Sequence, residues 1–202
     1  MSDDRRLIVG LGNPGPEYAW TPHNLGFLAI DFIAEQAGIR VTRPEAQSYV
    51  GIGEFAGHAV MLAKPQTMMN ASGAAVRMLL DRHELDPAEM IVLVDDFDLP
   101  WGMLRIRPKG SPGTHNGLRS VVGGADTVEF IRIRMGVGPE KRHGELRDYV
   151  LGRMSKEQRV IATEMIESAA DAVSIIMNEG TEKAMTKYNR RVKQSEEGED
   201  QS

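Results

Sequence analysis

The sequence predicts a layered α/β domain with a mixed β-sheet. Short apolar runs typical of strands alternate along the chain with segments whose apolar residues recur at helical spacing, and this alternation indicates stacked layers of sheet and helix. Two of the runs, 48–54 and 58–63, are separated by a short turn that contains a glycine, which predicts an antiparallel hairpin and therefore strands of both orientations. A chain of 202 residues can bury one substantial core, so we expect one domain at 1–192.

The predicted elements follow from these local patterns. The strand candidates are apolar runs such as RLIVG and MIVLV, and they lie at 6–10, 48–54, 58–63, 90–94, 102–107 and 129–137. The helix candidates carry apolar residues three and four positions apart, and they lie at about 23–37, 68–83, 116–122, 155–178 and 181–192. The segment 193–202 is predicted to be a disordered acidic tail, because it lacks the apolar residues that a core requires.

The composition excludes several classes of site. Without cysteine the chain can form no disulfide, thiolate metal site or thiol nucleophile. No apolar run approaches the roughly 18 residues that cross a bilayer, and no signal peptide precedes the first strand, so we expect no membrane partner and a cytoplasmic location. The net charge is −5, but the tail places one lysine against four carboxylates. The rest of the chain is nearly neutral, so a polyanionic partner is not excluded.

The segment LIVGLGNPGPEY at 7–18 spells G-x-G-x-x-G, with Gly10, Gly12 and Gly15 directly after an apolar run. In a dinucleotide-binding turn the third glycine opens the helix on which the pyrophosphate lies. Here helical periodicity starts only near residue 24, and no acidic residue suited to a ribose follows at the expected distance. The pattern therefore favours a tight turn that presents Asn13 at the carboxyl end of the strand over a nucleotide site.

Polar residues follow three of the predicted strands. They are Asn13 after the first strand, Met68 with Asn70 after the third, and Asp95, Asp96 and Asp98 after the fourth. If these strands are parallel neighbours, the residues share one edge of the sheet, where open α/β sheets place their sites. Metal binding by the three aspartates is an alternative, but successive strand residues face opposite ways. No nucleophile elbow, Walker loop or H-E-x-x-H motif occurs.

Two histidines lie near these strand ends in the sequence. His23 begins a predicted helix just after the Asn13 turn, and His115 lies in the glycine-rich turn GSPGTHNGLRS ahead of a short helix. His23 can be interpreted in two ways, as a residue that only starts a helix or as a residue with a role in proton transfer. His58 and His83 are interpreted as surface or structural residues.

Four long blocks now carry a resemblance to a known family. GLGNPGPEYAWTPHNLGF, KPQTMMNASG, DDFDLPWG and KGSPGTHNGLRS resemble, in order and spacing, the signature blocks of bacterial peptidyl-tRNA hydrolases, and the likeness runs from about Leu7 to Tyr188. The resemblance implies a single three-layer α/β/α domain with a mixed, mostly parallel twisted sheet. It also implies a monomeric enzyme that needs no metal or other cofactor. Such an esterase cleaves the bond between a peptide, or an N-blocked aminoacyl group, and the 3′ ribose of tRNA.

The resemblance also assigns roles to individual residues. His23 matches the catalytic base of the family, Asp95 the carboxylate that orients it, and Asn13 the residue that distinguishes blocked from free aminoacyl groups. Positions that contact the substrate in the family match Tyr18, Met68, Asn70 and Asn116, and Asn70 is the favoured oxyanion donor. Three positions depart from the commonest pattern and put fine substrate contacts in doubt. They are Pro22, Met68 and Thr114.

Local basic clusters add a predicted surface for tRNA phosphates. The residues expected to contribute are Arg105, Lys109, Arg134, Lys141, Arg142 and His143. A solvated strand face is the alternative interpretation of these clusters. The alternative function is a non-catalytic RNA-binding protein on the same fold, although the presence of both His23 and Asp95 argues against it.

Overall fold

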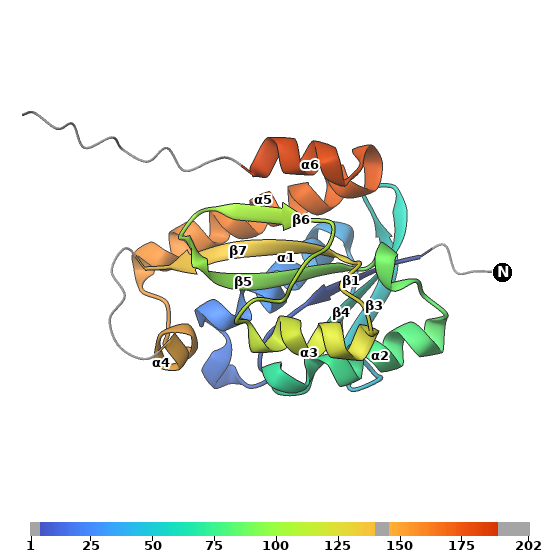
Figure 1. Ribbon diagram of the computed structural model, residues 1–202, viewed down its shortest axis with the longest axis horizontal. Coiled ribbons are helices and arrows are strands. Elements are labelled where there is room, and N and C mark those ends of the chain that lie inside the picture. The colour runs from blue at the N-terminus through green and yellow to red at the C-terminus, as the bar shows by residue number, and fades with distance from the viewer. Residues whose placement is uncertain (1–4, 140–145, 190–202) are drawn as a thin grey trace, which may run out of the picture.

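The computed structural model describes residues 5–139 and 146–189, and it contains one seven-stranded sheet in the order β2-β3-β4-β1-β5-β7-β6 (Figure 1). The strands are β1 (Arg6–Gly10), β2 (Arg43–Glu45), β3 (Ser48–Phe55), β4 (His58–Pro65), β5 (Ile91–Pro100), β6 (Leu104–Arg107) and β7 (Ile131–Gly138). The four central strands β4, β1, β5 and β7 run parallel. Strands β2 and β3 continue the sheet as an antiparallel pair on one side, and β6 pairs antiparallel with β7 on the other. The prediction of a mixed sheet, parallel at its centre, is confirmed.

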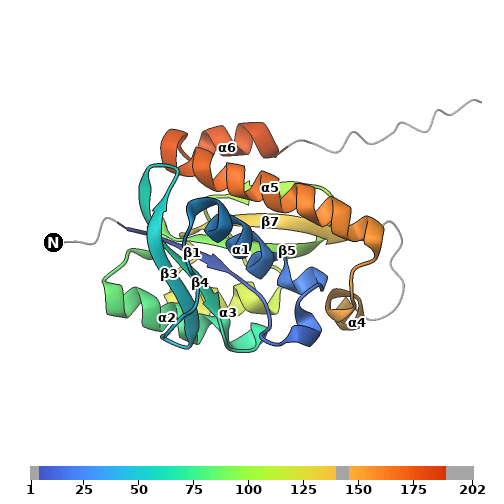
Figure 2. The ribbon, with the colours of Figure 1, turned by 180° about the vertical axis from the view of Figure 1, so that it is seen from behind.

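Helices cover both faces of this sheet, so the fold has three layers (Figures 1 and 2). The helices are α1 (Leu25–Ala37), α2 (Ser72–His83), α3 (Asn116–Ala125), α4 (Leu146–Leu151), α5 (Lys156–Glu179) and α6 (Thr181–Tyr188). Two buried clusters separate the layers: α1, α5 and α6 pack on one face, whereas α2 and α3 pack on the other. No helix in the described ranges is long and apolar enough to cross a bilayer.

The alternation of side chains along β1 shows how one strand supplies both cores. Ile8 packs in the cluster with α1 and α5, whereas Leu7 and Val9 pack in the cluster with α2 and α3. All three side chains are buried, and each contributes about 1.5–3 kcal/mol relative to an exposed position. An apolar run without polar interruptions is therefore what a central parallel strand requires.

Two glycines of the first sequence block explain the G-x-G pattern. A Cβ atom added to Gly10 would lie 2.1 Å from the carbonyl oxygen of Gly26 in α1, and one added to Gly12 would lie 2.7 Å from the Phe27 ring. The glycines thus let α1 lie directly on the end of β1. This close approach brings the residues just before α1 next to the turn that carries Asn13.

Several boundaries differ from the prediction for local reasons. Strand β5 continues to Pro100, well past residue 94, because its polar second half still pairs with β7 after a register shift. Helix α2 begins at Ser72 because the 3-10 turn Met69–Ala71 precedes it, and the turn Pro22–Asn24 likewise precedes α1. The short elements β2 and α4 are not predicted, since three and six residues are too few for a periodicity. The tail 193–202 lies outside the described residues.

Candidate active site

A pocket of about 510 Å³ lies at the carboxyl ends of the central strands. It receives residues from the turns after β1 and β4, from β5, from the start of α3 and from α4, all of which converge at the same end of the sheet in Figure 1. Its lining consists of Asn13, His23, Met68, Met69, Asn70, Asp95, Asp96, Phe97, Thr114, His115, Asn116, Arg134, Val150 and Leu151.

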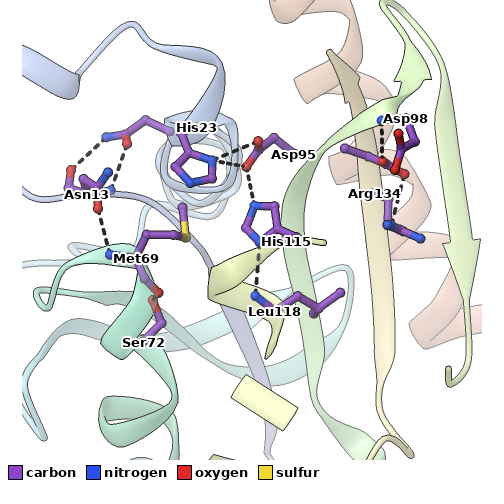
Figure 3. A network of polar contacts seen from close by, with 11 residues as sticks. Asn13, His23, Met69, Ser72, Asp95, Asp98, His115, Leu118 and Arg134 are labelled. Atoms are coloured by element: carbon purple, nitrogen blue, oxygen red, sulfur yellow. Dashed lines mark hydrogen bonds and ion pairs between the residues drawn. The ribbon is translucent and has the colours of Figure 1, made fainter. Parts of the chain in front are cut away.

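Asn13 is held rigidly at the base of this pocket. Its backbone N–H donates to Oδ1 of Asn24 and its carbonyl accepts from Nδ2 of Asn24, both at 2.9 Å. The side-chain Oδ1 of Asn13 accepts the backbone N–H of Met69 at 2.7 Å (Figure 3). Because these bonds commit Oδ1 to the protein, the two N–H donors of Nδ2 are the groups that Asn13 can offer to a ligand.

His23 and His115 share the carboxylate of Asp95, which is only 2% exposed (Figure 3). Nδ1 of His23 lies 3.0 Å from Oδ1 and 2.9 Å from Oδ2 of Asp95. Nε2 of His115 lies 2.9 Å from Oδ1, while Nδ1 of His115 accepts the backbone N–H of Leu118 at 3.1 Å as the N-cap of α3. An accepting Nδ1 requires that His115 carry its proton on Nε2, so His115 donates to Asp95. His23 likewise donates through Nδ1, which leaves its Nε2 for the pocket.

The carboxylate of Asp95 sets the electrostatics of the pair. Burial lowers the pKa of His23, but the charge of Asp95 and its hydrogen bond outweigh burial, so the pKa is raised above 6.5. Burial alone would raise the pKa of Asp95, yet the positive charge that both histidines can carry and their hydrogen bonds hold it far below its usual range. Asp95 is therefore ionised at neutral pH, and its charge raises the pKa of His23 above that of a free imidazole.

His23, Asp95 and His115 are also close enough to one another to be considered as metal ligands. Their nearest nitrogen and oxygen atoms lie within 4.8 Å of one another. However, Nδ1 of His23 and Nε2 of His115 already stand at hydrogen-bond distance from Asp95, and the other ring nitrogen of His115, Nδ1, accepts the backbone N–H of Leu118. Hydrogen bonds between protonated nitrogens and one carboxylate account for this arrangement, and the geometry fits an acid–base site better than a metal site.

The remaining walls of the pocket are of two kinds. Phe97 from β5 and Val150 with Leu151 from α4 supply an apolar wall. The Tyr149 ring meets the edge of Phe97 at 5.6 Å between centroids, and its hydroxyl accepts from Nε1 of Trp101 at 2.7 Å, which holds α4 against β5. The amides of Asn70 and Asn116 supply exposed donors and acceptors on the opposite rim.

Comparisons with known proteins show to which family a chain with this site belongs. The family described as peptidyl-tRNA hydrolase matches residues 7–197. The chain belongs to this family. The peptidyl-tRNA hydrolase of Solibacter usitatus is 49% identical over 92% of this chain and 94% of its own, and that of Koribacter versatilis is 47% identical over 96% of each. The crystal structure of peptidyl-tRNA hydrolase from Acinetobacter baumannii superposes with a TM-score of 0.84 at 33% identity, covering 92% of this chain and 94% of that one.

Most residues predicted from the resemblance to peptidyl-tRNA hydrolases meet in the one pocket. Those that line it are Asn13, His23, Met68, Asn70, Asp95 and Asn116. Arg134, predicted from the basic clusters, also lines it. Tyr18 does not line it and instead lies half-buried in the 3-10 turn Pro16–Tyr18. The three aspartates do not converge, because Asp95 faces the histidines while Asp96 pairs with Nε of Arg134 at 3.0 Å.

The predicted phosphate contacts are spread over a wider area. Arg105 lies on β6 directly opposite Arg134 of β7, so both side chains share one face of the sheet. Lys109 is exposed and pairs with Glu129 at 3.2 Å. The other three, Lys141, Arg142 and His143, lie outside the described residues.

The sequence alone did not predict that His115 and the apolar wall belong to the site. The signal for His115 was present, because a histidine in a glycine-rich turn before a helix is placed to cap that helix. Val150 and Leu151 gave no signal, since only the fold brings α4 to the pocket.

Proposed function

We propose that this chain hydrolyses the ester between a peptide and the 3′ ribose of tRNA, with His23 as the general base and Asp95 as the carboxylate that orients it. The observation that carries the assignment is the hydrogen bond from Nδ1 of His23 to a buried, ionised carboxylate. This bond fixes the tautomer in which Nε2 is unprotonated and faces the pocket, as a base for water requires. Membership of the peptidyl-tRNA hydrolase family supplies the substrate.

The reaction then needs no covalent intermediate. A water molecule gives a proton to Nε2 of His23 as its oxygen forms a bond to the ester carbonyl carbon. The imidazolium is stabilised by Asp95, and it returns the proton to the ribose 3′ oxygen as the carbon–oxygen bond breaks. The products are the free peptide acid and tRNA with a free 3′ hydroxyl. All groups that move a proton come from one chain, so we propose that a monomer acts without metal or cofactor.

Amide donors complete the site around the reacting carbonyl. Nδ2 of Asn13 can donate to the carbonyl oxygen of the acyl group that blocks the substrate amine, since Oδ1 of Asn13 is used by Met69. A free α-ammonium has no carbonyl there, and it would bring an uncompensated charge to an amide donor. Asn70 and Asn116 lie on the pocket rim, and Asn70 remains our proposed donor to the developing oxyanion.

Basic side chains near the pocket are proposed to contact tRNA phosphates. Arg134 reaches the pocket itself, and Arg105 stands beside it on the same face. Lys109, Lys141, Arg142 and His143 are proposed to extend this surface, which would attract the tRNA backbone without reading its sequence.

The test is release of the acyl group from N-acetyl-aminoacyl-tRNA, measured beside free aminoacyl-tRNA. We expect rapid release from the blocked substrate only, and release that is slower by about 10²–10⁴-fold from the His23→Ala variant. Binding of both tRNAs without release by the intact chain would instead support the alternative of a non-catalytic RNA-binding protein.

A further inference from the structure

Arg132 is a buried cation that forms no ion pair with a carboxylate of the described residues. Its side chain lies on β7 and is 1% exposed, and no carboxylate of the described residues lies within 4.0 Å of it. Burial, aided by the nearby charge of Arg134, lowers the pKa of Arg132 to about 10, although the charge of Glu129 acts in the opposite direction. The side chain is therefore charged at neutral pH although it is buried, which is costly for the fold. Such a residue calls for a specific role.

The guanidinium of Arg132 binds two segments of backbone at once. Nη1 donates to the carbonyl of Gly110, and Nη2 donates to the carbonyls of Val128 at 2.8 Å and Phe130 at 3.1 Å. Its plane also lies over the Phe130 ring, 4.1 Å from the centroid. Gly110 belongs to the loop after β6, whereas Val128 and Phe130 belong to the segment that enters β7. Arg132 thus fastens the loop to the sheet.

The fastened loop, 108–115, is joined to α3 at its last residue, His115, but the residues before His115 have few buried contacts, and the Lys109–Glu129 ion pair of this loop is exposed. Most of its residues are exposed, and Gly110 and Gly113 adopt φ values of 141° and 61° that disfavour other residues. Its other described backbone bonds are of two kinds. The Gly110 N–H donates to the Val128 carbonyl at 3.3 Å and the Gly113 N–H to Oγ of Ser111 at 3.1 Å. Arg119 donates to the Gly113 carbonyl at 3.2 Å through its side chain and to the His115 carbonyl at 2.9 Å through its backbone N–H. Segments with few buried contacts open locally at low cost. His115 is the last residue of this loop.

We infer that Arg132 is a positioning residue of the reaction: by fastening loop 108–115 to β7 it keeps His115 on the carboxylate that orients His23. The inference rests on the proposed function for its kinetic consequence. When His115 donates to Asp95, it draws part of the negative charge of the carboxylate away from His23. If the loop loosens, Asp95 stabilises the His23 imidazolium more strongly, so the base titrates at higher pH.

The other charged groups around His23 are fixed and do not depend on the loop. Asp95 comes from β5, and the ion pair of Asp96 with Arg134 spans β5 and β7 at 3.0 Å. His115 is the group facing Asp95 that the loop delivers. Arg132 also acts by charge on Arg134, which lines the pocket, so the experiment must separate an effect that passes through His115 from one that passes through Arg134.

The experiment measures the pH dependence of kcat/KM for Arg132→Met, Arg132→Lys and a matched control, Arg107→Met. Arg107 is exposed and lies directly opposite Arg132 on β6, so its removal takes the same charge from the same face without touching the loop carbonyls. We expect both Arg132 variants to raise the midpoint by about one unit, from the loss of one hydrogen bond to a charged group. The control should leave the midpoint unchanged. Arg132→Lys keeps the charge but cannot span three carbonyls, and it serves as the test if the methionine variant fails to fold.

A double-mutant cycle decides whether the effect passes through His115. In the background of His115→Ala, Arg132→Met should produce no further shift of the midpoint. NMR titration of the His23 ring needs no substrate, so it reports the same shift even if the chain proved inactive and the proposed function failed. An unchanged His23 midpoint in Arg132→Lys, or an equal shift with and without His115, would overturn the inference.

Discussion

The charge of Asp95 offers the sharpest test of the proposed mechanism, through the variant Asp95→Asn. The orientation of the new amide follows from the structure. His115 presents an N–H to the Oδ1 position because Leu118 occupies its other nitrogen, so the amide oxygen must take that place. The amide NH₂ then stands at the former Oδ2 position, which lies 2.9 Å from Nδ1 of His23. The variant thus keeps the shape of the site but weakens the preference for the reactive tautomer.

The size of the effect follows from the lost charge. With the two charge centres roughly 4 Å apart and an effective dielectric constant of about 20, the imidazolium loses about 4 kcal/mol of stabilisation. At 1.36 kcal/mol for each tenfold change, this amounts to about 10³-fold in kcat/KM. The midpoint of the pH profile should also fall, because burial then acts on the His23 pKa without the opposing carboxylate.

The assay is release of N-acetyl-aminoacyl groups from tRNA between about pH 5 and 9. In the intact enzyme, activity rises with pH through a His23 pKa above 6.5, whereas in Asp95→Asn the weaker activity should rise at lower pH. His23→Ala serves as the control and should lose about 10²–10⁴-fold. The double variant should be little worse than His23→Ala, because the pair acts as a unit. A midpoint that stays in place, or losses that multiply, would refute the reasoning.

Three further predictions test other parts of the molecule. Asn13→Ala should narrow the preference for blocked over free aminoacyl-tRNA while tRNA affinity is kept, and equal selectivity in a competition assay would remove Asn13 from that role. Arg105→Ala with Arg134→Ala should raise KM more than it lowers kcat and should flatten the dependence of binding on salt, and an unchanged salt slope would count against phosphate contact. Gly10→Ala should lower stability in urea unfolding by about 1–3 kcal/mol or more, because its Cβ meets backbone at 2.1 Å. Gly123→Ala, where a Cβ has no neighbour within 4 Å, should be neutral or stabilising by up to about 1 kcal/mol, and equal losses at both glycines would contradict the packing argument.

The sequence predicts the central elements well because their patterns are local. A run such as RLIVG must be a buried strand, and helical spacing places α1 and α5 within two residues of their observed ends. What it misses depends on tertiary pairing. The extension of β5 past residue 94 exists because β7 lies beside it, and the approach of α4 to the pocket is set by Trp101 and Tyr149.

The candidate site shows the same division. Family blocks point to His23 and Asp95, but the role of His115 depends on a helix cap and a shared carboxylate that spacing does not reveal. The direction of the Asn13 amide also needs the structure, because an asparagine in the sequence offers a substrate both an amide oxygen and an amide NH₂. The bond from Met69 assigns that oxygen to the protein.

The short outer strands of the sheet have a consequence for how the protein behaves at high concentration. Strand β2 has three residues and contains Pro44, and β6 has four residues and carries Arg105 and Arg107. Open sheet edges can recruit a strand from another molecule, and brevity, proline and positive charge each discourage that pairing. The four parallel strands β4, β1, β5 and β7, which carry most of the buried apolar side chains of the sheet, lie between these two edges. Another molecule can therefore pair with their backbone only after the domain unfolds.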